Sequence, residues 1–183
     1  MIVTIAMSIF EQAEMIEPVS THAATDYAAK QAEIVLRENE LLGAVPNLAE
    51  ILGSQPIEVM FENHFNHARF MANVFRFNHY RLMARIVVWV YRSYHARKFS
   101  FEYFRLALPS WQQAVGENLK QPESAEINRI YQWLIDHHGD FVELAQDNDY
   151  VIFSMHTDRE DLKKTLLPLL LQGDFHTCSA ITM

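Results

Sequence analysis

Apolar residues recur at intervals of three and four positions along most of this 183-residue chain, which is the spacing of amphipathic helices. The pattern is densest between Pro56 and Leu119, where two of the three tryptophans and most of the arginines also lie. Few glycines and prolines interrupt it, so a sandwich of short strands is excluded. We therefore predict an all-α protein whose consecutive helices pack on one another as a bundle.

Capping and turn residues divide this pattern into separate elements. We expect helices over residues 25–42, 56–77, 79–97 and 125–146, a further helix that opens at Ser100, and a short helical turn over 48–52. Pro109 should kink or restart the helix that opens at Ser100, because proline removes a backbone hydrogen bond.

The two ends of the chain show other patterns. Residues 1–20 form an apolar arm that needs a partner surface, which a second copy of the chain could supply. Residues 150–153 are the only strand-like passage, between turn residues. A capping box over 157–160 opens a helix that runs to about residue 171, and another helix begins at Phe175.

The helix expected over residues 25–42 carries its apolar positions on one stripe, and a glutamate falls on that stripe. The stripe comprises Tyr27, Ala28, Gln31, Ile34, Val35 and Glu38. The residues on the solvated side are Lys30, Glu33, Arg37 and Glu40.

Composition narrows the function classes. Half of the residues are apolar, yet no uninterrupted apolar run reaches the length of a membrane helix, and the N-terminus lacks the basic segment of a signal peptide. A single cysteine, Cys178, leaves no internal disulfide, so we expect a cytoplasmic protein. The net charge of −8 argues against nucleic acid as a partner.

The positive charge is concentrated in the central helices. Residues 62–105 contain eight Lys or Arg residues against two Glu residues. Arg81, Arg85 and Arg92 share one helix face that suits an anion or a docking partner. The alternative, which we prefer, is that they pair with acidic residues within the chain or across a subunit boundary.

Two histidines and two methionines share a face of the helix expected over residues 56–77. His64, His67 and Met71 follow Met60 at helical spacing, so they could hold a metal or supply a haem axial ligand. No carboxylate or HExxH motif completes a coordination set, so we favour satisfied core histidines and predict no metal site.

An aromatic cluster follows on the next two helices, and it could line a pocket for a flat ligand such as haem or a bilin, or form plain core. Its members are Trp89, Tyr91, Tyr94, Phe99, Phe101, Tyr103, Phe104 and Trp111. The candidate ligand-binding residues are His64, His67, Met71, Trp89, Tyr94 and Trp111. No nucleophile motif, phosphate loop or paired-carboxylate motif is present, so we predict no enzyme and no catalytic residues.

The stretch from His67 to Val115 resembles the helical segment that precedes the cobalamin-binding module in some bacterial sensory and regulatory proteins. In that pattern a His opens an aromatic-rich helix, a Trp lies midway along the second helix, and an Arg-bearing turn leads to the third. His67, Trp89 and Arg97 stand at those places. The arrangement is also similar to globin-like sensor domains, some of which carry no haem, and it implies a globin-like bundle of about six to eight helices.

Residues 161–183 resemble the first helices of the cobalamin module's helical lobe, where a Leu-rich helix ends in Gly-Asp, here Gly173-Asp174. The resemblance divides the chain into a sensor-like domain over 1–157, with the arm, and a truncated lobe over 158–183. The cobalt-ligand motif Asp-x-His-x-x-Gly does not occur, so cobalamin binding in the manner of that family is not expected.

Together these patterns predict a non-enzymatic sensory or regulatory domain, a homodimer that passes a ligand or partner signal through helix packing. One alternative is a sensor that binds a tetrapyrrole or another apolar small molecule in the aromatic pocket. A second alternative is the N-terminal part of a cobalamin-binding protein.

Overall fold

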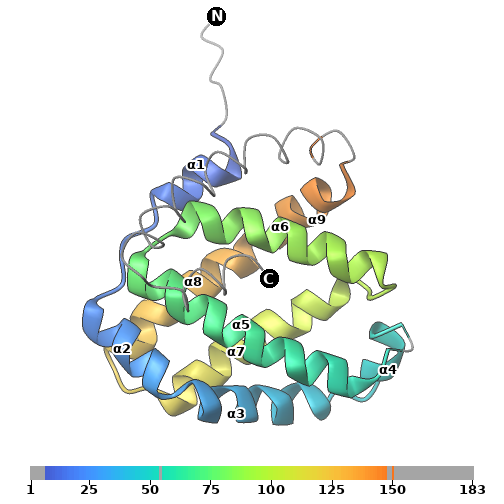
Figure 1. The fold of residues 1–183 in the computed structure, drawn as a ribbon, viewed down its shortest axis with the longest axis horizontal. Helices are drawn as coiled ribbons and strands as arrows, with labels where there is room; N and C mark the ends of the chain where they lie inside the picture. Colours follow the sequence, from blue (N-terminus) through green and yellow to red (C-terminus); the bar gives the residue numbers. More distant parts are fainter. Residues whose placement is uncertain (1–6, 54, 148–149, 151–183) are drawn as a thin grey trace, which may run out of the picture.

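The computed structural model describes residues 7–53, 55–147 and 150, and over this part of the chain all regular structure is helical (Figure 1). Its nine helices are α1 (Ile9–Glu14), α2 (Thr21–Ala29), α3 (Gln31–Gly43), α4 (Leu48–Ile51), α5 (Ile57–Phe77), α6 (Tyr80–Ala96), α7 (Glu102–Asn118), α8 (Glu123–Asp136) and α9 (His138–Gln146). The all-α class is therefore confirmed for the described residues, and the predicted bounds of α5 and α6 are correct to within one residue. The expected number of about six to eight helices is too low, because the described residues already contain nine, two of the expected helices each being divided in two. The globin-like arrangement stays a prediction.

The helices pack as two groups that meet at α5 and α6. One group comprises α1, α6 and α9, and the other comprises α2, α3, α5, α7 and α8. Helix α6 packs chiefly against α1 and α9, in the upper part of Figure 1. Helix α5 packs against α2 and α3, in the lower part, and contacts α6 only sparsely. Helices α7 and α8 pack on each other, and they also contact α3 and α2, respectively. The sparse α5–α6 boundary is where the candidate site lies.

The prediction of a single helix over residues 25–42 is wrong, because the structure has two helices there, α2 and α3. Helix α2 begins earlier than expected, since the Ser20 side chain accepts a hydrogen bond from the Ala23 N–H. It ends at Lys30, whose φ of −104° and ψ of 8° depart from helical geometry. This break lets α2 pack on both α5 and α8, while α3 packs on α5 and α7.

The helix expected over residues 125–146 is also two helices. His137, with φ −100° and ψ 13°, separates α8 from α9, and its Nδ1 lies 2.9 Å from the Trp133 carbonyl oxygen. Helix α8 packs on α7, and after the break α9 packs on α6.

Helix α7 runs unbroken from Glu102 to Asn118, so Pro109 does not restart it, and the kink that was the other expected outcome stays a prediction. Pro109 and Arg105 are both exposed. The proline leaves the Arg105 carbonyl without its helical donor at a position on the exposed side of the helix.

The described part of the N-terminal arm packs on its own chain. Helix α1 lies on α6 (Figure 1), and both Ile9 and Ala13 are buried there. A second copy of the chain is therefore not needed to cover these two residues. Residues 1–6 lie outside the described part.

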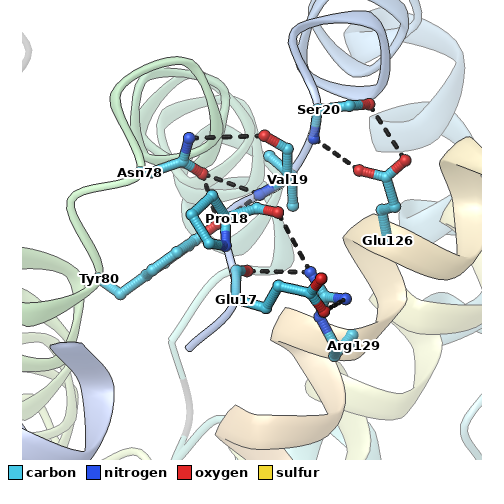
Figure 2. A network of polar contacts seen from close by, with 8 residues as sticks. All are labelled: Glu17, Pro18, Val19, Ser20, Asn78, Tyr80, Glu126 and Arg129. Atoms are coloured by element: carbon cyan, nitrogen blue, oxygen red, sulfur yellow. Dashed lines mark hydrogen bonds and ion pairs between the residues drawn. The ribbon is translucent and has the colours of Figure 1, made fainter. Parts of the chain in front are cut away.

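A network of polar contacts attaches the segment after α1 to the rest of the molecule (Figure 2). The Val19 N–H lies 3.0 Å from Asn78 Oδ1 and 3.1 Å from the Tyr80 hydroxyl oxygen. Arg129 on α8 forms an ion pair with Glu17 at 2.6 Å and donates to the Glu17 carbonyl oxygen at 2.9 Å. These contacts determine where the chain enters α2.

The turn after α4 requires a glycine. Gly53 has φ +61°, and a Cβ at this position would clash with the Lys98 carbonyl oxygen. The Ser100 N–H donates to the Ile51 carbonyl oxygen at 3.0 Å. Together these contacts join α4 to the turn between α6 and α7.

The remaining predictions concern the C-terminal part of the chain. Tyr150 is helical, and the rest of the strand expected over 150–153 lies outside the described residues, as do the helices expected after residue 157. None of the described helices combines the length and the apolar character needed to cross a membrane.

Candidate functional site

A cavity of about 610 Å³ lies between α5, α6 and α7. Most of its wall is aromatic or aliphatic, and Phe70, Tyr94, Phe104, Leu108 and Trp111 contribute to it. The size falls within the range of small-molecule sites in proteins. It lies at the boundary where α5 and α6 make few contacts with each other.

Five of the six predicted ligand-binding residues line this cavity. They are His64, His67, Trp89, Tyr94 and Trp111. Trp89 is 57% exposed, so the cavity reaches the surface at its side chain. Met71 is fully buried in the core and is not part of the wall.

His64 is held from both sides on α5 and is only 2% exposed. Its Nδ1 lies 2.5 Å from Asn39 Oδ1, and its Nε2 lies 2.9 Å from the Tyr103 hydroxyl oxygen. Burial, aided by the nearby His67, lowers the pKa of His64 to about 3, so the ring is neutral at pH 7. An amide oxygen only accepts, so Nδ1 carries the proton and Nε2 accepts from Tyr103.

His67 lies one turn further along α5, with its ring centroid 4.7 Å from that of Trp111. Its Nε2 is 3.3 Å from the Tyr131 hydroxyl oxygen, which in turn is 3.1 Å from the Tyr27 hydroxyl oxygen. Burial lowers the pKa of His67 to about 4, so this ring is also neutral at pH 7. Within the described residues, Nδ1 of His67 has no hydrogen-bond partner.

Glu38 is buried behind this wall on α3, with no exposed surface. The Ser110 hydroxyl donates to its Oε1 at 2.8 Å, while Oε2 has no hydrogen-bond partner among the described residues. Burial raises the pKa of Glu38 to about 8, so this carboxyl group is mostly protonated at pH 7. The two histidines of the wall are therefore polar but uncharged at pH 7, and the glutamate outside the wall is mostly uncharged.

Glu38 falls on the apolar stripe predicted for its helix, but it was not among the predicted site residues. That position was the available signal, since a carboxyl group among core residues must be neutral or paired. Asn39 and Tyr131 carried no such signal, because their partners His64 and His67 lie on another helix.

Arg81, Arg85 and Arg92, which were predicted to share an anion-binding face, each contact a different part of the molecule. Arg81 forms an ion pair with Glu14 at 2.8 Å, and Arg92 donates to the Asp147 carbonyl oxygen at 2.5 Å. Only Arg85 of the three lines the cavity, and its guanidinium lies 5.7 Å from the centroid of the Phe10 ring.

One cluster of metal-ligating side chains occurs among the described residues, away from the cavity. His22, Asp26 and Glu123 bring their ligand atoms within 4.8 Å of one another between α2 and α8. The His22 side chain is 72% exposed, and exposed clusters of this kind are common without a metal.

Comparison of the chain with protein-family models, with curated proteins and with solved structures found no match.

Proposed function

We propose that this chain is a non-enzymatic sensory domain that binds an apolar small molecule in the cavity between α5, α6 and α7. The observation that carries the proposal is the cavity itself, about 610 Å³ with a mainly aromatic and aliphatic wall. A few polar groups in an otherwise apolar pocket are typical of small-molecule sites. Here these groups include His64, His67 and Asn63.

The protonation of the histidines supports binding rather than acid–base catalysis. General acids and bases work best with pKa values near the working pH. The pKa values of His64 and His67, about 3 and about 4, make both rings weak bases at pH 7. Glu38 has a suitable pKa of about 8, but its side chain does not line the cavity.

The helix packing suggests how occupancy would be transmitted. A ligand between α5 and α6 would contact both helix groups, and α6 is held mainly by α1 and α9 (Figure 1). Binding would then favour one of the possible distances between α6 and α5. This shift would alter the surface formed by α1, α6 and α9. The homodimer predicted from the sequence stays a prediction.

A tetrapyrrole is the second candidate ligand, and one observation favours it. His67 lines the cavity, and its Nδ1 has no hydrogen-bond partner among the described residues, so it could coordinate a haem iron. His64 fits this role less well, because Asn39 and Tyr103 engage both of its ring nitrogens.

Titration with the neutral fluorophore Nile red tests the cavity as a binding site. We expect saturable binding with an increase in fluorescence, and we expect Ser93→Trp to abolish it, since Ser93 lines the cavity and an indole would fill it. Ala125→Trp, at an exposed position of α8, is the matched control and should bind as the unmodified chain does. Equal binding by both variants would contradict the proposal, provided that circular dichroism shows both to be folded.

Absorption spectra with haem, biliverdin and cobalamin test the second candidate. A Soret or bilin band that shifts in His67→Ala and not in His79→Ala would support it, because His79 is exposed and lies outside the cavity wall. Spectra that equal those of the free pigments would exclude all three as ligands.

A further inference from the structure

The arginines of this chain differ in whether they have an acidic partner. Among the described residues, ion pairs join Arg37 to Glu117, Arg81 to Glu14, Arg105 to Glu102, and Arg129 to Glu17. Arg69 on α5 and Arg97 at the end of α6 line the cavity, and neither forms an ion pair with an acidic side chain among the described residues. The chain has 23 acidic residues against 15 basic ones, so acids are not scarce.

The cavity wall is correspondingly one-sided in charge. Three arginines line it, Arg69, Arg85 and Arg97, and no Asp or Glu of the described chain does. The two histidines of the wall are neutral at pH 7, because burial depresses the pKa of each. The formal charge around this apolar cavity is therefore positive, which favours a ligand that carries a negative group.

The two ends of the cavity are not equivalent for an anion. Arg97 is the C-cap residue of α6, where the partial negative charge of the helix terminus opposes anion binding. Arg69 lies in the half of α5 that adjoins the turn at Asn78, away from the C-terminal end of α6. Arg69 is therefore the better anchor.

We propose that the ligand of this cavity is an amphipathic carboxylic acid, with its apolar body against the aromatic wall and its carboxylate on the guanidinium of Arg69. This inference rests on the proposed function and deepens it. A guanidinium binds a carboxylate with two parallel hydrogen bonds, which adds orientation as well as affinity. The apolar body would contact Trp111, Phe104 and Phe70.

The test compares each acid with its own methyl ester, which has the same apolar body and no charge. Dodecanoic acid and methyl dodecanoate compete with Nile red at pH 7.5 and low salt, and biliverdin and its dimethyl ester form a second pair. We expect the acid of at least one pair to bind about tenfold more tightly than its ester. A difference in the first pair identifies a single-chain acid as the ligand type, and a difference in the second pair alone identifies a tetrapyrrole.

Variants then locate the carboxylate. Arg69→Gln should remove the difference between acid and ester and leave the affinity for the ester unchanged. Arg76→Gln is the matched control, because Arg76 is exposed on the same helix, outside the wall, with its guanidinium over the Phe77 ring. The Arg76→Gln variant should keep most of the difference in affinity between acid and ester.

Several outcomes would overturn this inference. Equal affinity for acid and ester in both pairs, no competition by any of the four compounds, or equal losses in the Arg69 and Arg76 variants would each do so. Nile red binding that Ser93→Trp blocks would still support the proposed function in those cases. Absence of Nile red binding would instead count against the proposed function itself.

Discussion

Tyr103 and Asn39 explain how His64 can be almost fully buried on α5. Each meets one ring nitrogen, so the neutral imidazole has both its donor and its acceptor satisfied. The arrangement uses three helices, α3, α5 and α7, and it places an uncharged polar group in the cavity wall. The ring therefore makes this part of the wall polar without adding charge.

Removal of the Tyr103 hydroxyl should therefore destabilise the fold. Tyr103→Phe leaves Nε2 of His64 without its donor, and a buried group that loses its partner costs about 1–3 kcal/mol. Urea unfolding at pH 7 measures the loss in the free energy of unfolding. The control is the same substitution in a His64→Leu background, where its cost should fall. An equal cost in both backgrounds would show that the hydroxyl acts through another group.

At the scale of the elements, the turn between α5 and α6 joins the two helix groups. Asn78 ends α5 in the left-handed conformation with φ 53°, and its Oδ1 accepts from the Val19 N–H at 3.0 Å and from the Tyr80 hydroxyl at 2.6 Å (Figure 2). One side chain thus sets the helix end and attaches the segment that precedes α2. Substitutions can separate these two roles, the left-handed helix end and the hydrogen bonds of the side chain.

Asn78→Gly keeps the backbone conformation and loses the hydrogen bonds of the side chain, so we expect a cost of about 1–2 kcal/mol in the free energy of unfolding. Asn78→Ala adds the left-handed strain of a residue with a Cβ, which is a further cost of about 1 kcal/mol. Thermal or urea unfolding of the two variants side by side measures both costs. If alanine and glycine proved equal, the left-handed conformation would not matter to stability.

At the scale of the whole molecule, three buried titratable groups should set the pH of greatest stability. His64 and His67 have pKa values of about 3 and about 4, below the ordinary 6.5, so stability is lost as pH falls below about 6.5. Glu38 has a pKa of about 8, above the ordinary 4.5, so stability is lost as pH rises from about 4.5 to about 8. Between pH 4.5 and 6.5 the two histidines outweigh the single glutamate.

These opposing effects predict a maximum of stability near pH 6.5. Urea unfolding over pH 4 to 9 measures the profile. Glu38→Gln should flatten the fall between pH 6.5 and 8, and His67→Gln should make the fall below pH 6.5 less steep. A profile in which Glu38→Gln changes nothing above pH 6.5 would show that Glu38 is not kept protonated in the folded protein.

Helix ends could be predicted from the sequence where residues within the same segment set them. Pro56, Asn78 and His79 bound α5 and α6, and both helices match their predicted ranges to within one residue. The breaks at Lys30 and His137 were missed because neither residue is a strong helix breaker. The packing of α2 on α8 and of α9 on α6 accompanies these breaks, and contacts between distant segments are not visible in a local pattern.

The all-α class and the two long central helices could be read from the local pattern of residues, as could the residues that share one face of each of these helices. Helical periodicity is a local property, so it placed His64 with His67 and predicted five of the residues that line the cavity. Only the tertiary structure decided that α5 and α6 leave a cavity between them, and that Glu38 lies buried near histidines that are neutral. The reason is physical, since burial and pKa depend on groups that converge from several helices.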